Sequence, residues 1–320
     1  MDAVIRAVRV SAKVLEARDV YSFELVALDG GELPAFSAGA HIDVHLPAGL
    51  VRQYSLCSNP AESHRYQIAV LRDSNSRGGS IGMHALEVGQ IIEIGEPRNH
   101  FPLSSDAPHN VLLAGGIGIT PLLCMAEHLA SQGTSFELHY CSRSDDRTAF
   151  AARLLAAPFA ASVHLHYDDG PQSQKLDLTH LLEQGPSNAH LYVCGPAAFM
   201  DWALDSARTA GWSEERLHRE YFASAPKNTS SDGSFDVEIA STGQVIRVAA
   251  DQTVIAALSS HGITVPTSCE QGVCGACLTR ILTGTPDHRD MFLTTEEQAR
   301  ADQFTPCCSR SRSAKLVLDL

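Results

Sequence analysis

The stretch S-C-E-Q-G-V-C-G-A-C-L, residues 268–278, says most about the architecture of this chain. Its cysteines are spaced C-x4-C-x2-C, at Cys269, Cys274 and Cys277. A cysteine pair, Cys307 and Cys308, follows about thirty residues later. This is the spacing at which four thiolates hold a plant-type [2Fe–2S] cluster. Such a cluster takes and releases one electron at a time, so the spacing predicts single-electron transfer.

Two other uses of these cysteines are less consistent with the sequence. A structural zinc site normally shows paired C-x2-C motifs, and only one two-residue gap is present here. A disulfide framework is disfavoured because the chain has 320 residues and nine cysteines, an odd number, and no secretory signal. Gly272 and Gly275 allow the positive φ angles with which a backbone wraps closely around iron.

Composition argues against two classes of partner. The formal net charge of -13 disfavours nucleic acid, whose phosphates attract basic surfaces, and it disfavours an anionic membrane surface. An acidic protein can instead dock on a basic patch of another protein. The longest apolar stretch, Val111–Ala126, contains glycines and a proline and is too short to span a bilayer. We therefore expect a cytoplasmic protein.

Three blocks and a linker follow one another along the chain, a multidomain arrangement of α+β and α/β parts. Residues 1–103 contain short apolar runs between turns, which predicts an antiparallel β-barrel. Residues 104–222 alternate strands and helices, which predicts a doubly wound parallel sheet. The polar segment 223–233 predicts a linker, and residues 234–320 predict a small β-grasp domain around the cysteine loop. The expected elements include strands over Val163–Tyr167 and Val245–Val248 and a helix over Arg147–Leu155.

Two loops of the middle block have the composition of a nucleotide site. In V-L-L-A-G-G-I-G-I-T-P, residues 111–121, a glycine-rich turn joins a strand to a helix, where bare backbone can approach a pyrophosphate. The segment Y-V-C-G-P, residues 192–196, is a second strand end that opens a helix. Each loop alone is also compatible with an ordinary strand-to-helix turn. Together they predict a site at the carboxyl edge of one sheet.

The first block contains two candidate sites for a charged cofactor. In V-R-Q-Y-S-L, Arg52 can offset a negative charge and Tyr54 can stack on an isoalloxazine ring. In N-S-R-G-G-S, a guanidinium, flexible amides and a hydroxyl precede a short helix, which suits an anion. Ordinary barrel turns would explain either segment taken alone. Their occurrence beside a nucleotide block and a cysteine loop favours a flavin.

The whole chain resembles the phthalate dioxygenase reductase family, and within it the vanillate-demethylase-type oxidoreductase subunits. The resemblance covers all three blocks in the order flavin, nicotinamide and [2Fe–2S]. It rests on the motifs R-Q-Y-S-L, R-G-G-S, G-G-I-G-I-T-P, Y-C-S-R-S, Y-V-C-G-P, C-E-Q-G-V-C-G-A-C, P-D-H-R-D and L-V-L-D-L.

The resemblance implies residue roles. It implies a flavin-binding barrel with FMN held by Arg52, Tyr54, Ser55, Arg77, Gly78, Gly79 and Ser80, with Phe222 over the ring. It implies an NAD-binding domain with NADH at Gly115, Gly116, Gly118, Thr120, Ser142, Arg143, Cys194, Gly195 and Pro196. The cluster ligands would be Cys269, Cys274, Cys277 and Cys307. Cys308 stays an alternative to Cys307, FAD to FMN and NADPH to NADH.

The function that the resemblance implies is an NADH-dependent reductase that passes electrons to a separate terminal oxygenase of the Rieske type. The chain itself lacks the C-x-H and C-x2-H pairs that such an oxygenase needs. No side chain is nominated as a catalytic acid or base, because hydride transfer to a flavin requires none. A redox-sensing or electron-carrier module and a self-sufficient flavin or quinone reductase are the alternatives.

The histidines give no further metal motif. The chain has fifteen of them, and they show no ligand spacing with other candidate ligands. His139, His164 and His166 alternate along predicted strands. We therefore expect a structural role for these three side chains.

Overall fold

The computed structural model describes residues 4–74, 76, 78–186, 188–222 and 232–320. The chain divides into two compact units, Met1–Glu220 and Tyr221–Leu320. Among the described residues, no helix combines the length and the apolar character needed to cross a membrane.

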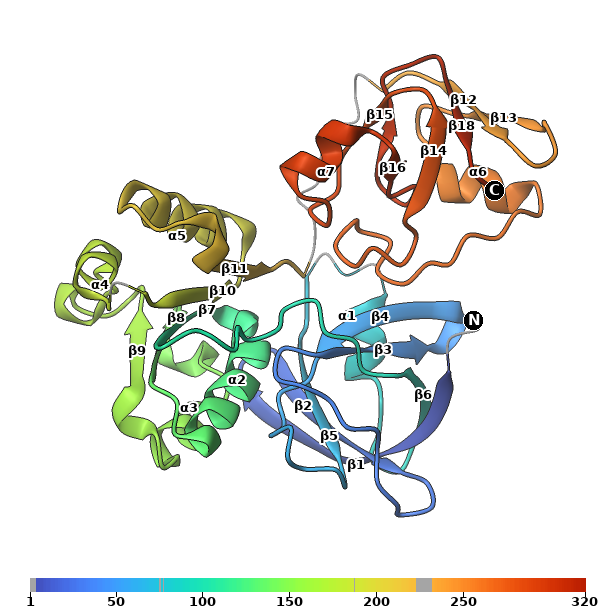
Figure 1. The fold of residues 1–320 in the computed structure, drawn as a ribbon. Helices are drawn as coiled ribbons and strands as arrows, with labels where there is room; N and C mark the ends of the chain where they lie inside the picture. The colour runs from blue at the N-terminus through green and yellow to red at the C-terminus, as the bar shows by residue number, and fades with distance from the viewer. Residues whose placement is uncertain (1–3, 75, 77, 187, 223–231) are drawn as a thin grey trace. The chain divides into compact units, whose positions relative to one another are not determined.

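The first block is a six-stranded antiparallel sheet in the order β4-β3-β6-β1-β2-β5 (Figure 1). Its strands are β1 (Ile5–Ala17), β2 (Val20–Ala27), β3 (His41–Leu46), β4 (Leu50–Ser55), β5 (Tyr66–Leu71) and β6 (Ile91–Gly95). A bridge between Leu56 and Ile68 joins the two ends of the sheet, so the sheet closes as a barrel. Phe23 and Leu25 alternate inward along β2, as the two-residue period of a strand requires. The helix α1 (Gly79–His84) adds Met83 to the same core.

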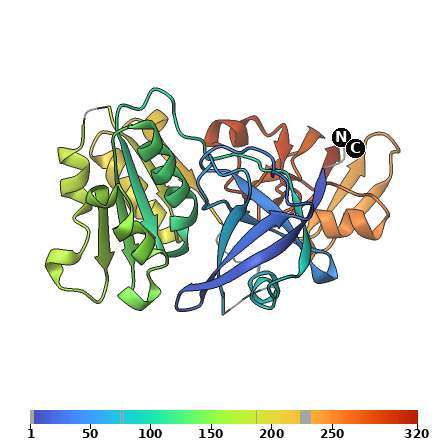
Figure 2. The same ribbon diagram turned by 90° about the horizontal axis from the view of Figure 1, so that it is seen from below.

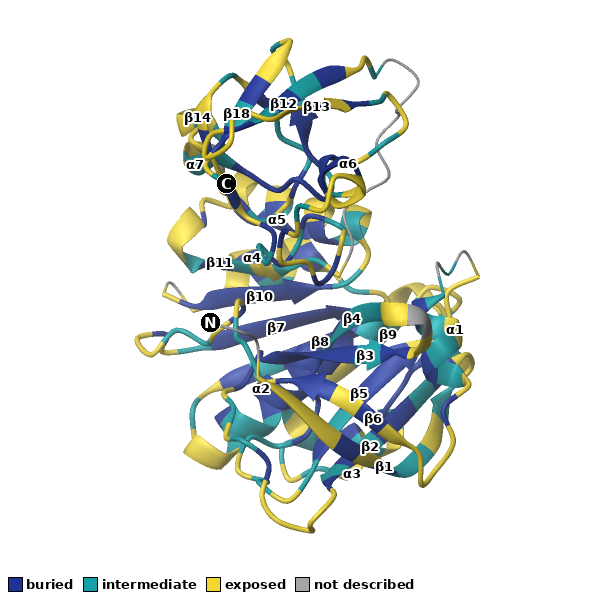
Figure 3. Ribbon diagram, turned by 90° about the vertical axis from the view of Figure 1, so that its right-hand side faces the viewer, coloured by how far each residue is buried: buried dark blue, intermediate teal, exposed yellow. Residues whose placement is uncertain are grey.

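The second block is a five-stranded sheet in the order β11-β10-β7-β8-β9, and every pairing in it is parallel. Its strands are β7 (Asn110–Gly115), β8 (Phe136–Ser142), β9 (Val163–Tyr167), β10 (His190–Cys194) and β11 (Leu217–Glu220). Helices cover both faces (Figure 1 and Figure 2), namely α2 (Ile119–Gln132), α3 (Ala151–Ala156), α4 (Leu178–Gln184) and α5 (Ala197–Thr209). Because both faces are covered, β7 and β10 are buried along their whole length (Figure 3).

The barrel and the parallel sheet share one hydrophobic core within the first unit. Cys57 and Phe101 of the first block pack in the same buried cluster as Leu122 and Met125 of α2. Arg153 of α3 reinforces this contact: it binds Glu127 at 2.6 Å and donates hydrogen bonds to side-chain and backbone oxygens in the first block. The boundary predicted at residue 103 therefore lies inside a continuously packed body.

The second unit is a mixed sheet in the order β13-β12-β18-β14-β16. Its strands are β12 (Phe235–Ile239), β13 (Val245–Val248), β14 (Thr279–Thr283), β16 (Gln303–Phe304) and β18 (Lys315–Leu318), and β15 (Pro286–Asp287) pairs with β17 (Arg310–Ser311). The helix α6 (Val254–Ser260) begins at Thr253, whose side chain accepts a hydrogen bond from the Ala256 amide, and it buries Val254 and Leu258 in the core. The helix α7 (Thr295–Arg300) begins with a capping box between Thr294 and Glu297.

The structure confirms the predicted fold class and adds elements that the prediction lacked. β9 and β13 have the predicted bounds. The helix expected over Arg147–Leu155 is shorter, because Phe150 has a left-handed φ of 63° and α3 starts after it. The strands β11 and β14 and the helix α7 were not predicted.

Candidate functional site

The predicted cluster ligands lie together in the second unit. The thiols of Cys269 and Cys274 contact each other, and so do those of Cys277 and Cys307; all four residues are buried. Backbone amides face the sulfurs: Gln271 N lies 3.3 Å from Sγ of Cys269. Thiolates stabilised in this way are the ligands that iron requires. The hydrogen bond from Cys274, together with these amides, holds the pKa of Cys269 below its ordinary value.

Two glycines allow the cysteine loop to close. Gly272 has φ +73°, and a Cβ there would lie 2.3 Å from Sγ of Cys308. Gly275 has φ +68°, and a Cβ there would lie 2.3 Å from the ring of Phe292. A larger residue at either position would therefore have to displace Cys308 or Phe292, or the loop itself.

Cys307 and Cys308 have different surroundings. The Cys307 thiol contacts the thiols of both Cys277 and Cys308, whereas the thiol of Cys277, within the described residues, is hydrogen-bonded only to that of Cys307. The sulfur of Cys308 lies 3.3 Å from the hydroxyl of Thr305, within hydrogen-bond distance, and it also approaches Ser309. This arrangement favours Cys307 as the fourth ligand.

The two predicted nucleotide loops meet at the carboxyl edge of the parallel sheet. Strands β7 and β10 are neighbours, with Ala114 paired to Cys194. A Cβ on Gly118 would lie only 2.1 Å from the carbonyl oxygen of Cys194, and a Cβ on Gly195 would lie 3.0 Å from Cα of Gly115. The glycines therefore let the two backbones touch. This leaves main-chain amides, and few side chains, on the surface of both loops.

The remaining residues of the two loops support these turns. Gly116 takes a left-handed φ of 53° just before α2, and the Thr120 hydroxyl donates to the carbonyl oxygen of Ile117 at 3.1 Å. Pro196 is the N-cap residue of α5. Burial raises the pKa of the Cys194 thiol well above its ordinary value, so this cysteine is a neutral thiol and not a nucleophile.

Ser142 and Arg143 lie at the end of β8, on the same edge of the sheet. The hydroxyl of Ser142 is buried and pairs with the Thr148 hydroxyl at 2.6 Å. The side chain of Arg143 is exposed. Only Arg143 of this pair therefore offers a side chain to a ligand at this edge.

Four of the predicted flavin residues of the barrel, Arg52, Gly78, Gly79 and Ser80, lie at the start of α1. A Cβ on Gly79 would lie 2.8 Å from Cγ of Arg52, so β4 and α1 are in close contact there. Gly78 has φ +93°, and the Ser80 hydroxyl accepts a hydrogen bond from the Asp73 amide at 3.1 Å. Tyr54 is half-buried, and burial raises the pKa of its phenol. Arg77 lies outside the described residues.

The sequence prediction missed an acid beside Ser55, the half-buried Glu220. The Ser55 hydroxyl donates to Oε2 of Glu220 at 3.1 Å, and Nδ1 of His41 lies 3.9 Å from Oε1. Burial raises the pKa of Glu220 to about 8 and, with Arg98 and His100 nearby, lowers the pKa of His41 to about 4. Burial thus favours the neutral form of each group, so the contact between them is weaker than an ordinary ion pair.

Glu220 ends β11, next to Cys194 in the sheet register. The site thus joins the end of the barrel strand β4 to the carboxyl edge of the parallel sheet. β11 reads L-H-R-E, one apolar residue followed by three polar ones, so no alternation in the sequence indicated this strand. Phe222, predicted to cover the flavin, belongs to the second unit, and its role stays a prediction.

The residues present fit the predicted cofactors. In the two nucleotide loops and at the start of α1, glycines stand where the Cβ of any other residue would collide with neighbouring atoms. The four buried thiols supply the donor set of a [2Fe–2S] cluster. The Ser55 hydroxyl and the Glu220 carboxyl lie where the end of β4 meets the carboxyl edge of the parallel sheet.

Comparison with known proteins agrees with this arrangement. Residues 112–205 match the oxidoreductase NAD-binding domain family, and residues 237–312 match the 2Fe-2S iron-sulfur cluster binding domain family. A vanillate O-demethylase oxidoreductase of Pseudomonas sp. (strain HR199 / DSM 7063) is 56% identical over 312 residues, which cover 97% of this chain and 98% of that protein.

The phthalate dioxygenase reductases are similar over the same length. The protein from Burkholderia cepacia is 40% identical over 314 residues, which cover 98% of this chain and 96% of its own. A solved structure, described as a modular structure for electron transfer from pyridine nucleotides to [2Fe-2S], is 39% identical, covers 99% of this chain and 98% of its own, and has a TM-score of 0.79. This chain therefore belongs to the phthalate dioxygenase reductase family, as an oxidoreductase that uses FMN, a [2Fe–2S] cluster and NADH.

Proposed function

We propose that this chain delivers electrons from NADH, through FMN and the [2Fe–2S] cluster, to a separate Rieske-type oxygenase that demethylates an aromatic methyl ether. The observation that carries the proposal is the 56% identity, over nearly the whole of both chains, to a vanillate O-demethylase oxidoreductase. The formal charge of -13 supports it, because an acidic reductase can be steered to a basic patch on its partner.

The proposed roles of the residues follow from their positions. Arg52, Gly78, Gly79 and Ser80 hold the FMN phosphate, and Tyr54 and Ser55 contact the ring. The touching loops at Gly118 and Gly195 hold the pyrophosphate of NADH on their amides. When bound, the flavin takes two electrons as hydride and releases them one at a time. The chain therefore has to hold the nicotinamide against the flavin, and no side-chain base is required.

An anaerobic titration with NADH tests the internal route. We expect the flavin and cluster absorbance bands to bleach together and to saturate at about three electrons per chain, two for the flavin and one for the cluster. The Cys274→Ser protein should lose the cluster bands and saturate at about two. Bleaching by dithionite but not by NADH would instead indicate a sensor or a carrier with another donor.

Turnover with a purified Rieske-type vanillate demethylase oxygenase tests the partner. We expect formaldehyde release that depends on both proteins, with one NADH oxidised per formaldehyde formed. The Cys274→Ser protein should still reduce its flavin but should not support formaldehyde release. Full activity with quinones and none with any Rieske oxygenase would favour a self-sufficient reductase.

A further inference from the structure

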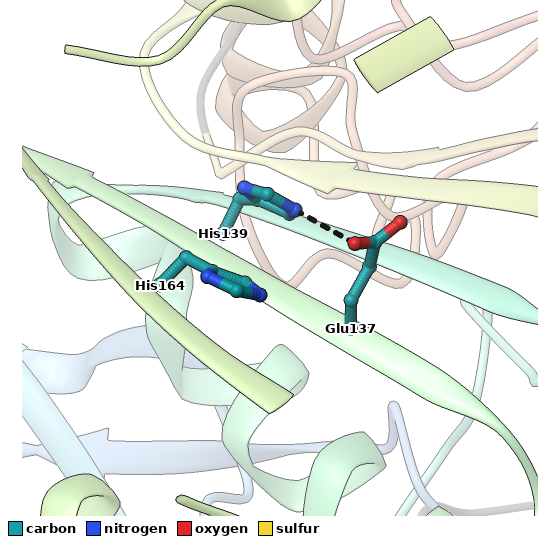
Figure 4. Close-up of side chains that lie close together, drawn as sticks. All are labelled: Glu137, His139 and His164. Carbon is teal, nitrogen blue, oxygen red and sulfur yellow. Dashed lines mark ion pairs between the residues drawn. The ribbon is translucent and has the colours of Figure 1, made fainter. Parts of the chain in front are cut away.

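A cluster of histidines lies on the parallel sheet, on side chains to which the proposed electron route gives no role. Glu137 and His139 are two residues apart on β8, so they share one face of the sheet. His164 lies on the edge strand β9, directly opposite His139 in the strand register. Figure 4 shows the three side chains together on that face.

The donor atoms of the three residues converge. One nitrogen or oxygen from each lies within 4.8 Å of the others. Oε2 of Glu137 is 3.2 Å from Nε2 of His139, while Oε1 is 3.5 Å from Nε2 of His109. His109 therefore holds one carboxylate oxygen and leaves the other aimed at His139.

A chain of hydrogen bonds behind His139 determines which of its nitrogens carries the proton. Nδ1 of His166 lies 3.0 Å from the carbonyl oxygen of Gln174, which can only accept, so this nitrogen carries a proton. Nε2 of the neutral His166 is then an acceptor, and it lies 3.0 Å from Nδ1 of His139. His139 therefore donates from Nδ1, and its Nε2 has a lone pair directed toward the cluster.

This lone pair is buried and lacks a hydrogen-bond donor. Among the described residues, no hydrogen bond of good geometry reaches Nε2 of His139, although Oε2 of Glu137 lies 3.2 Å away, at ion-pair distance. Only 8% of His139 is exposed, so water does not readily replace the missing partner. A lone pair beside a carboxylate oxygen requires a cation between them, either a proton or a metal ion.

We propose that Glu137, His139 and His164 bind a divalent transition-metal ion, for which Zn²⁺ is the test ion. Two imidazoles and one carboxylate are a frequent zinc ligand set, with water as the fourth ligand. Mg²⁺ and Ca²⁺ are disfavoured because they prefer oxygen ligands. His166 is a positioning residue, since its bond to His139 resembles the outer-shell contacts that orient metal-binding histidines. The exposed ring of His164 stacks on the ring of His139 with the centroids 4.7 Å apart, so metal binding requires a rotation of this side chain that closes the distances.

Zinc binding by the full-length holoprotein tests the proposal. After equilibrium dialysis against Zn²⁺, we expect one zinc per chain by mass spectrometry of the metals, with the iron content unchanged. His164→Ala should weaken zinc binding by at least about 10-fold. The matched control is His180→Ala, which removes another exposed histidine of the same sheet domain and should leave binding unchanged. Absence of zinc binding would overturn the proposal. Equal zinc binding by His164→Ala and His180→Ala would also overturn it, because the zinc would then lie elsewhere.

The role of His166 has its own test. Leucine at this position removes the acceptor for His139, and we expect zinc affinity to fall by about 10- to 100-fold. Glutamine keeps an oxygen acceptor near the position of Nε2, so His166→Gln should recover most of the affinity at equal thermal stability. Equal losses in both variants would mean that His166 acts only through packing. A loss of iron in any variant would show that the zinc had displaced the cluster instead.

Discussion

Glu220 is the residue from which we expect the largest pH dependence of stability in the first unit. Burial raises its pKa to about 8 from the ordinary 4.5, and the hydrogen bond from Ser55 offsets only part of this rise. The unfolded chain releases the proton near pH 4.5, while the folded chain keeps it up to about pH 8. The folded state thus binds more protons in this window, so the free energy of unfolding falls as the pH rises through it.

Replacing Glu220 by glutamine should remove this dependence. Glutamine has nearly the same shape and can still accept the hydrogen bond from Ser55. Relative to wild type, we expect Glu220→Gln to gain roughly 2 to 4 kcal/mol of stability between pH 5 and pH 8, measured by urea unfolding of the flavin-loaded protein. The exposed Glu215, replaced in the same way, should change nothing. Parallel pH profiles for wild type and Glu220→Gln would contradict a raised pKa.

The adjacent cysteines Cys307 and Cys308 make opposite predictions. Because the Cys307 thiol faces Cys277, we expect Cys307→Ser to lose most of the iron and sulfide. The Cys308 sulfur contacts Thr305 and Ser309, so Cys308→Ser should retain the cluster. Iron and sulfide per chain, with the electron paramagnetic resonance signal of the reduced protein, measure both. If Cys307→Ser retains the cluster and Cys308→Ser loses it, Cys308 and not Cys307 is the fourth ligand.

At the scale of elements, the contact between the β7–α2 loop and the end of β10 leaves no room for a side chain at Gly118. A Cβ at position 118 would lie 2.1 Å from the Cys194 oxygen and 2.6 Å from the Gly195 nitrogen, and both atoms are backbone. Gly118→Ala must therefore separate the two loops. We expect a loss of about 1 to 3 kcal/mol in stability and a raised KM for NADH.

The matched control for Gly118→Ala is Gly233→Ala, where a Cβ would meet nothing within 4 Å. It should leave both the melting temperature and KM at the wild-type values. An unchanged KM in a destabilised Gly118→Ala protein would mean that the loops serve packing and do not bind the nucleotide.

Periodicity and spacing predicted the elements that have strong local signals. The apolar residues of β9 and β13 follow a pattern clear enough for the ends of both strands to be predicted. The C-x4-C-x2-C spacing alone was enough to predict the cysteine loop. β11 has four residues and is stabilised by its neighbour β10, so the local sequence hardly marks it. For the same reason Glu220 was missed. His139 and His164 are 25 positions apart, and only the strand register brings them together.

At the scale of the whole molecule, the first unit shows why sequence blocks and folding units differ. The barrel and the parallel sheet have different patterns, which predicted two domains. Yet Gly39 in the first block packs so closely that a Cβ there would lie 2.0 Å from the Phe101 carbonyl and 2.9 Å from the methyl group of Met125. Contacts of this kind depend on shape and not on pattern, so they cannot be read from one sequence.

Truncation distinguishes the sequence blocks from the folding units. We expect residues 1–222 to yield a soluble protein that binds FMN, unfolds in one transition and is bleached by NADH, because this fragment keeps the shared core intact. Residues 1–103 alone would expose Cys57 and Phe101, which pack against α2 in the full chain, so this fragment should aggregate or fail to fold. Solubility, FMN content and thermal unfolding of both fragments measure the difference. A folded 1–103 fragment that binds FMN would show that the barrel is stable without the shared core. If the 1–222 fragment does not fold, the second unit is needed for the first unit to fold.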